Sequence, residues 1–321
     1  MGSGEFDLIA RYFAPLAGSD GPAYGLSDDA AILSPPAGYD LIFTKDALVA
    51  DVHFFSDDPA DLVAQKALRV NLSDLAAMGA KPLGYLLALS LPKNMNEIES
   101  WVSDFTAGLK KDQDQFGWSL FGGDTVSTSG PLTLSVTAIG TVTKGTALRR
   151  SGAKVGEGIY VSGTLGDGAL GLKCLKDNID SPSLIKRYHL PTPRLTLGQK
   201  LFGIASSVLD ISDGLAGDIA HICGLSGLGA SIESKLIPVS DAAGKILESF
   251  PAYNDLIWNG GDDYELLFTA PDHMAEKIKD ISASLMLPLT KIGHMTDKLE
   301  VVILDDKGKN LLQGQRGFRH F

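Results

Sequence analysis

The chain has little cysteine, no long hydrophobic run and no secretion signal. Its two cysteines, Cys174 and Cys223, cannot make a disulfide framework or a zinc site, and both fall on apolar helix faces where burial is expected. The longest apolar runs, 83–91 and 132–142, are well short of the roughly 20 residues that cross a bilayer. The first residues lack the basic start and apolar core of a signal peptide. We therefore expect a cytoplasmic protein with no membrane partner.

Basic residues are also scarce, with 28 Lys and Arg against 39 Asp and Glu and a net charge of −11. Non-specific nucleic-acid binding depends on clustered positive charge, so no nucleic-acid partner is expected. If the ligand is itself anionic, cations have to mediate its binding. The phosphate loop of ordinary P-loop kinases is absent. The glycine-rich stretch 163–171 matches no nucleotide fingerprint, and fits a close-packed turn and a backbone contact to a nucleotide equally well.

The length of 321 residues is about twice that of a usual single domain, so two domains are expected. The polar, glycine-containing stretch 143–155 favours a junction, which gives domains 1–148 and 149–321. Strands and helices alternate in both halves, and this predicts an α/β (α+β) fold. We expect strands over 31–33, 40–43, 82–91, 119–121, 132–142, 158–162, 207–211, 264–269 and 289–294, and helices over 5–13, 59–78, 95–116, 182–188, 194–205, 214–225 and 272–285, with one more from Asp167.

Several short segments with aspartate are present, each expected where a strand-like run breaks into a turn or a helix start. Carboxylates so placed can converge, and hard oxygen ligands without a thiol cluster are what Mg²⁺ prefers. The sequence therefore predicts metal-assisted phosphate chemistry. The segments are Gly25–Asp29, Thr44–Asp46, Asn71–Asp74, Gly122–Thr125, Asp210–Gly214 and Gly260–Asp263.

Each feature also has a structural interpretation. Asp74 interrupts an apolar helix and needs a partner, which can be a hydrogen-bonding group or a metal. Gly122 to Asp124 is often only a turn, and Asp210 to Gly214 is similar to a helix cap, although N–H groups at a helix start also favour phosphate oxygens. His53 is either a strand-edge histidine or a substrate contact. Arg149 and Arg150 are either phosphate ligands or surface charges.

Taken in order, the motifs resemble those of the thiamine-monophosphate kinase family over essentially the whole chain. This family belongs to a group of ATP-using enzymes that includes aminoimidazole ribonucleotide synthetase and selenophosphate synthetase. The resemblance rests on the stretches Gly4–Ile9, Gly25–Ala31, Val70–Ala80, Phe121–Thr125, Arg150–Lys154, Asp210–Leu215, Gly260–Phe268 and Arg316–Phe321.

The resemblance implies a homodimer in which the N-terminal β-sheet domains pair into a shared β-barrel, while the C-terminal α/β domain completes the active-site cleft. It implies the reaction of ATP with thiamine monophosphate to give ADP and thiamine diphosphate, the last step of thiamine diphosphate biosynthesis. ATP is then a co-substrate, and several Mg²⁺ ions are expected at each site. Two polyanions brought together beside so many carboxylates would otherwise repel strongly.

The resemblance also implies roles for individual residues. Asp74, Asp124 and Asp213 are implied to be catalytic. The implied metal ligands are Asp29, Thr44, Asp46, Asp74, Asp124, Asp210 and Asp213. The implied nucleotide contacts are Gly123, Asp124, Arg150 and Ser212. The implied contacts to thiamine monophosphate are His53, Asp262 and Phe318.

The chain departs from the family pattern at Ser27, where glycine is usual, at Asp262, where glutamate is usual, and at Lys45, whose cation lies beside Asp46. Two alternatives remain: another enzyme of the group with a different acceptor, or an inactive nucleotide-binding scaffold. No cysteine precedes Cys174, which disfavours selenophosphate synthetase. The scaffold is disfavoured because the chain retains the acids of all the segments.

Overall fold

The computed structural model describes residues 5–312, so Phe318 lies outside the described residues. The chain forms two compact units. The first comprises Met1–Leu75 and Ala80–Gly145, and the second comprises Ala76–Gly79 and Thr146–Phe321. The chain enters the second unit after Gly145, whereas the sequence suggested a domain boundary after Leu148. Within residues 5–312, no helix combines the length and the apolar character needed to span a bilayer.

The first unit is built on a four-stranded sheet with the strand order β1-β4-β2-β3. β1 (Tyr39–Val49) pairs antiparallel with β4 (Thr133–Thr143), and β4 pairs antiparallel with β2 (Lys81–Pro92). β3 (Ser119–Thr128) runs parallel to β2. The edges of the sheet are therefore β1 and β3.

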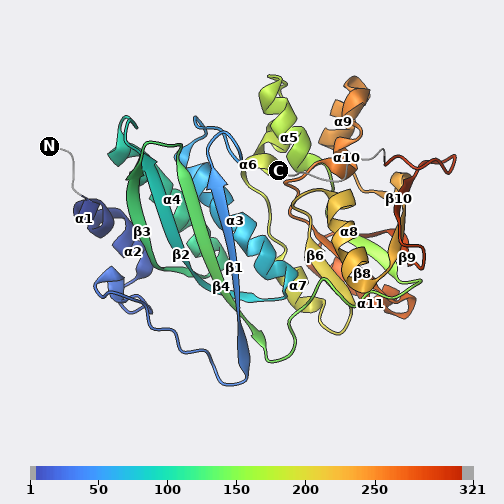
Figure 1. Cartoon of the computed structure of the whole chain (residues 1–321), viewed down its shortest axis with the longest axis horizontal. Coiled ribbons are helices and arrows are strands. Elements are labelled where there is room, and N and C mark those ends of the chain that lie inside the picture. Colours follow the sequence, from blue (N-terminus) through green and yellow to red (C-terminus); the bar gives the residue numbers. More distant parts are fainter. Residues whose placement is uncertain (1–4, 313–321) are drawn as a thin grey trace. The chain divides into compact units, whose positions relative to one another are not determined.

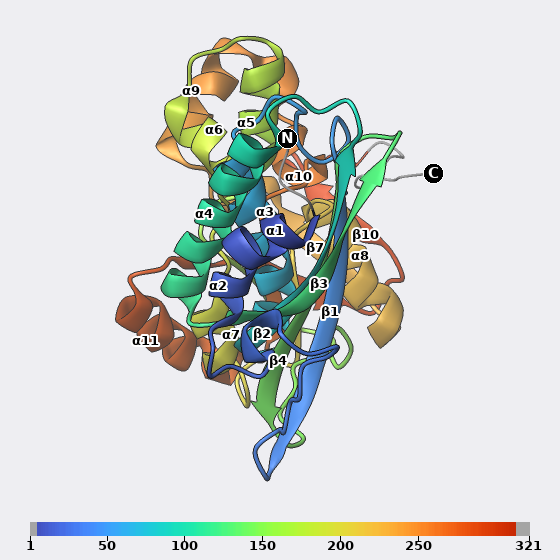
Figure 2. The same ribbon diagram turned by 90° about the vertical axis from the view of Figure 1, so that its left-hand side faces the viewer.

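Helices α3 (Ala60–Ala77) and α4 (Ile98–Phe116) lie along one face of this sheet (Figures 1 and 2). Arg69 of α3 and Asp112 of α4 form a buried ion pair, with 2.7 Å between Nε and Oδ2. The pair ties the two helices together beneath the sheet. Shorter helical segments precede β1: α1 (Glu5–Leu8), η1 (Ile9–Phe13), α2 (Ala14–Ala17) and η2 (Tyr24–Leu26).

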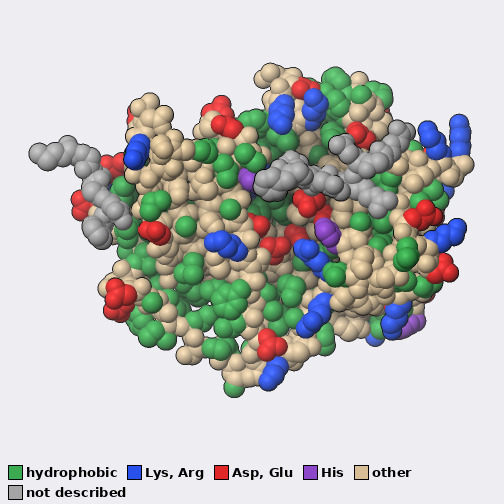
Figure 3. Space-filling model, viewed as in Figure 1, with side chains coloured by type: hydrophobic (Ala, Val, Ile, Leu, Met, Phe, Trp, Pro, Cys, Tyr) green, Lys and Arg blue, Asp and Glu red, His purple; other side chains and the backbone are tan. Residues whose placement is uncertain are grey.

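The opposite face of this sheet exposes apolar side chains. Phe43 on β1 is 60% exposed, Leu86 on β2 is 40% exposed and Val126 on β3 is 46% exposed. Figure 3 shows hydrophobic side chains gathered over these strands. The sheet is open within the described residues, so the dimeric β-barrel that the family resemblance implies is not observed in the single chain.

The second unit contains a six-stranded sheet, in which antiparallel pairs predominate. Along the sheet the strands are β10 (Val301–Leu304), β7 (Gly229–Glu233), β9 (Leu289–Thr296), β5 (Gly158–Ser162), β8 (Leu266–Ala270) and β6 (Ser207–Asp210).

Helices cover both faces of the six-stranded sheet because alternate side chains of its strands point to opposite sides. Ile159 belongs to the core formed with α8 (Leu215–Ser226), whereas its neighbour Tyr160 belongs to the core formed with α7 (Leu195–Lys200) and α11 (Ala275–Leu285). A third apolar cluster joins α5 (Asp167–Lys176), α6 (Pro182–His189) and α9 (Asp241–Ser249). The remaining helical segments are η3 (Ser234–Leu236), η4 (Pro251–Tyr253), α10 (Leu256–Asn259) and η5 (Asp272–Met274).

Several expected elements differ from the structure. The expected strand over 31–33 is wrong: this segment has no regular structure and leads into Pro35 and Pro36, which cannot donate ladder hydrogen bonds. β3 does not end at Phe121 but continues through the glycines to Thr128, paired with β2. β7, β10, α9 and α10 were not expected. Both cysteines are buried on helices, as expected.

Candidate functional site

Three of the predicted site residues meet on the helix-covered face of the first unit. Thr44 and Asp46 alternate along β1 and share that face, where α3 presents Asp74. The Thr44 hydroxyl donates to Asp74 Oδ2 at 2.5 Å. The backbone N–H of Asp46 donates to Asn71 Oδ1 at 3.2 Å, which ties the strand to the same helix. Asp46 and Asp74 therefore lie inside β1 and α3, not at their ends.

The carboxylates of Asp46 and Asp74 repel each other. Burial, together with the charge of Asp74, raises the pKa of Asp46 to about 6. A pair of close, partly desolvated carboxylates is stabilised by a bound cation. The donors are a hydroxyl and two carboxylates, which are hard oxygen ligands, so this group fits Mg²⁺.

Asp124 lies apart from this group within one chain. It is exposed on β3, at the other edge of the sheet from Asp46. The cross-strand row that starts at Asp46 runs through Val136 and Leu87 to Gly123, which amounts to three strand spacings or roughly 14 Å. The segment from Gly122 to Thr125 is therefore part of a strand, whereas the sequence suggested a turn. Residues 122–125 also line a small cavity of about 40 Å³ beside Phe13 and Leu120.

The remaining predicted residues of this unit are His53 and Asp29. His53 follows β1 in a turn, and its Nδ1 accepts the N–H of Val49 at 3.0 Å. In the neutral ring this bond leaves the proton on Nε2. Asp29 lies in an exposed bend before β1. The contacts of this unit therefore bring Thr44 and Asp74 together beside Asp46, whereas Asp124 lies at the other edge of the sheet.

In the second unit, β6 ends at the buried Asp210 and the chain then turns through Ser212 and Asp213 into α8. The N–H groups of Ser212, Asp213 and Gly214 each donate to Asp218 Oδ2 at 3.1 Å. The sequence suggested that these donors would favour a phosphate. In the structure these N–H groups instead donate to the carboxylate of Asp218, which lies in the first turn of α8.

The sequence analysis did not single out Asp218 or His221. The position of Asp218, four residues after Gly214, nevertheless indicates an acid that can accept the free N–H groups at the start of α8. Burial and the charge of Asp213 raise the pKa of Asp218 to about 7, and the nearby Arg150 partly opposes this shift. Oxygens of Asp213 and Asp218 lie within 4.8 Å of a His221 nitrogen, which is close enough for one cation. Acidic groups of this kind are common without a metal.

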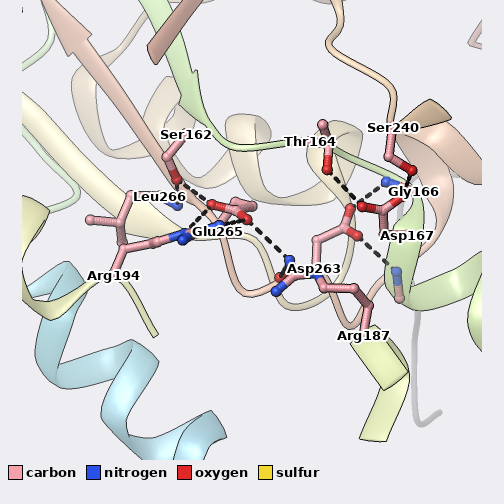
Figure 4. Close-up of polar contacts among 11 residues, drawn as sticks. Ser162, Thr164, Gly166, Asp167, Arg187, Arg194, Ser240, Asp263, Glu265 and Leu266 are labelled. Atoms are coloured by element: carbon pink, nitrogen blue, oxygen red, sulfur yellow. Dashed lines mark hydrogen bonds and ion pairs between the residues drawn. The ribbon is translucent and has the colours of Figure 1, made fainter. Parts of the chain in front are cut away.

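At the glycine-rich start of α5, the backbone N–H groups are likewise bound by a carboxylate of the same unit. The carboxylate of Asp263 accepts the N–H of Gly166 at 2.7 Å and that of Gly168 at 3.0 Å (Figure 4). Of the two interpretations of the stretch 163–171, the structure therefore supports the close-packed turn. Burial raises the pKa of Asp263 to about 7, against the opposing effect of these two N–H groups.

Asp262 lies in the loop that precedes β8, next to the Asp213 turn. Its N–H donates to the carbonyl of Ser212 at 3.0 Å, and its Oδ1 accepts from the Tyr264 hydroxyl at 3.2 Å. Gly261 has no room for a side chain, because a Cβ there would lie 2.3 Å from the Ser212 carbonyl oxygen. Ser212, Asp213 and Asp262 therefore form one packed corner of the second unit.

Comparison with known proteins agrees with the sequence motifs. Residues 27–142 match the AIR synthase related protein, N-terminal domain, and residues 154–306 match the corresponding C-terminal domain. The thiamine-monophosphate kinase of Escherichia coli strain K12 is 43% identical over 331 residues, covering 100% of this chain and 99% of the relative.

Solved structures give the same result. The thiamine-monophosphate kinase of Stenotrophomonas maltophilia K279a is 41% identical, with a TM-score of 0.81 over 89% of this chain and 90% of that chain. AaThiL complexed with AMPPCP and TMP is 28% identical, with a TM-score of 0.79 over 99% and 97% of the two chains. The chain belongs to the thiamine-monophosphate kinase family.

Proposed function

We propose that this protein transfers the γ-phosphoryl group of ATP to thiamine monophosphate, giving ADP and thiamine diphosphate. The observation that carries the proposal is the 43% identity to a thiamine-monophosphate kinase along the whole chain. A related structure holds AMPPCP and TMP together, which are an ATP analogue and the acceptor of this reaction.

The chemistry suits the residues. A phosphate monoester has a second pKa of about 6, so the acceptor is largely ionised at neutral pH and needs no strong base. Catalysis then depends on alignment of the two phosphates and on neutralisation of their charge. Within the described residues, both glycine-rich helix starts of the second unit bind internal carboxylates, so phosphate charge has to be compensated by other groups.

Mg²⁺ is the proposed source of that compensation. Thr44, Asp46 and Asp74 are the best-formed ligand group, and Asp29, Asp124, Asp210 and Asp213 are the other proposed ligands. When bound, the ion withdraws negative charge from the transferring phosphoryl oxygens. The chain's own residues hold the substrates: Gly123, Asp124, Arg150 and Ser212 at the nucleotide, and His53, Asp262 and Phe318 at thiamine monophosphate. A cytoplasmic location remains a prediction.

We also propose a homodimer that forms through the four-stranded sheet. One face exposes Phe43, Leu86 and Val126, and each edge strand pairs on one side only among residues 5–312. Pairing β3 of one copy with the β1 edge of a second copy would remove both edges and place the strand that carries Asp124 next to the partner strand that carries Asp46.

The proposed reaction is tested by ADP release with thiamine monophosphate, with free thiamine and with no acceptor, in Mg²⁺. We expect turnover only with thiamine monophosphate, because the alcohol of free thiamine is un-ionised and carries no phosphate. Turnover with a different acceptor of the group would support the first alternative. ATP binding without turnover under any condition would support the scaffold.

A further inference from the structure

The loop that carries Asp262 has a strained backbone. Asp262 (φ 67°) and Tyr264 (φ 52°) both adopt left-handed conformations that side chains rarely take, at a cost of about 1 kcal/mol or more each. Such a conformation persists only where surrounding contacts enforce it. Here the N–H groups of both residues donate to the neighbouring turn, to the carbonyls of Ser212 at 3.0 Å and Ile211 at 2.8 Å.

Side chains alternate in this segment. Asp262 and Tyr264 are partly exposed, whereas Asp263 and Glu265 are only 1% and 0% exposed. Glu265 is paired with the guanidinium groups of Arg187 and Arg194, and it accepts the Ser162 hydroxyl at 2.5 Å. Asp263 and Glu265 are thus both held in the interior through their carboxylates (Figure 4).

Asp263 differs from Glu265 in its partners. Its two carboxylate oxygens accept backbone N–H groups, from Gly166 and Gly168. Backbone donors cannot rotate away, so these two bonds fix the direction of the side chain more strictly than a flexible partner does. The Arg187 guanidinium also donates to the Asp263 carbonyl at 2.9 Å, which fixes the peptide on the other side.

The backbone of the Asp262 residue lies directly against the same glycine turn. A Cβ on Gly168 would lie 2.2 Å from the carbonyl oxygen of Asp262. A change at the Asp263 carboxylate therefore moves the Asp262 backbone, because both are packed on one rigid helix start. A buried carboxylate is a costly way to stabilise a fold, whereas a fixed direction is what a substrate contact needs.

We propose that Asp263 is a positioning residue, which holds the left-handed backbone of Asp262 against the Gly166–Gly168 turn and so aims the Asp262 carboxylate at the cationic ring system of thiamine monophosphate. The inference rests on the proposed function and adds a specificity determinant to it. Asp263 itself touches neither substrate nor metal in this account.

The test compares Asp263→Asn with Asp167→Asn. Asp167 is buried in the same turn, but it accepts the hydroxyls of Thr164 and Ser240, both at 2.6 Å, and does not bond to the Asp262 loop. Asparagine at 263 presents an NH₂ group to one of the two N–H donors. Asparagine at 167 can still accept from one hydroxyl and donate to the other.

For Asp263→Asn we expect KM for thiamine monophosphate to rise about tenfold or more, because a small misplacement weakens a directed contact. KM for ATP should stay within about twofold, and Asp167→Asn should lower Tm without changing either KM. Equal changes of both KM values in Asp263→Asn, or an unchanged KM for thiamine monophosphate, would overturn the inference.

If Asp263→Asn does not fold, Gly168→Ala provides the second variant, because its methyl group displaces the Asp262 carbonyl while Asp263 is retained. The same selective rise of KM is expected, and its absence would overturn the inference. Wild-type enzyme is measured in the same assay. Inactive wild type would refute the proposed function, whereas active wild type with unselective variants would refute only the role of Asp263.

Discussion

Asp46 shows how a single residue can be unfavourable for folding and useful for function. Its carboxylate is largely removed from water and faces Asp74, which is why its pKa is raised to about 6. A protein selected for stability alone has no reason to keep this charge there. Strongly perturbed acids of this kind are more frequent at functional sites than elsewhere.

Asp46→Asn should therefore stabilise the metal-free protein at pH 8. The folded pKa lies above the unfolded value of 3.8, so the ionised wild type loses stability as pH rises from about 4 to about 6 and beyond. The gain of the variant over wild type should grow over that interval. Urea unfolding in EDTA at pH 5 and pH 8 measures it, and kinase activity of the variant should fall.

A suitable control is Asp40→Asn, on the same strand but partly exposed, where Asp40 accepts the N–H of Gly145 at 3.0 Å. It should give no gain in stability at either pH. If Asp46→Asn is no more stable than wild type at pH 8, the two carboxylates do not repel each other as inferred.

At the residue scale, the motifs indicate candidate site acids, but they do not indicate the residues that hold these acids in place. The bond between Gly166 and Asp263 joins positions 97 residues apart, and no local pattern indicates such a pair. Asp218 was closer to recognition, because it lies in the first helical turn after the Asp213 motif. Both are internal acids at helix starts, where the sequence left open either a structural turn or a ligand contact.

At the scale of elements, strands β2, β4 and β5 and helices α4 and α8 were predicted within a few residues because their apolar periodicity is strong. β3 was predicted too short, since its glycines suggested a turn. Gly123 is instead needed for pairing, because a Cβ there would lie 1.9 Å from the Leu87 carbonyl oxygen. Backbone proximity between strands is a tertiary property that periodicity does not reveal.

The edge strands β1 and β3 carry different parts of the proposed metal site, which leads to a complementation prediction. Asp46→Asn and Asp124→Asn should each be inactive alone. In mixed dimers, one site would contain both substitutions and the other none. Co-expression at equal levels should restore about a quarter of wild-type activity, because half of the dimers are mixed and each has one intact site.

After purification through two different tags, which retains only the mixed dimers, the expected activity is about half of wild type. The reference is the doubly substituted chain co-expressed with wild type, whose mixed dimers have no intact site. Mixed dimers as inactive as the single variants would show that each site takes both acids from one chain. That outcome would remove the proposed pairing of β3 with β1.

At the scale of the whole molecule, the two-unit organisation is read from length and composition, but the assignment of Ala76–Gly79 to the second unit is not. These residues comprise the end of α3 and the turn that follows it, and only packing against Leu148 and Gly198 shows where they belong. Fold alone does not fix the acceptor, since AIR synthase related domains serve a group of enzymes. The choice of thiamine monophosphate depends on identity along the full chain.

The most direct measurement is ADP release with thiamine monophosphate and Mg²⁺ for wild type, Asp74→Asn and Asp213→Asn, with Asp272→Asn as an exposed control. Asp74 and Asp213 are both among the proposed metal ligands, so both are expected to be needed for phosphoryl transfer. Wild type and control should turn over alike, while each site variant should lose about 100-fold or more in kcat with its Tm preserved. A site variant that keeps wild-type kcat would contradict the account.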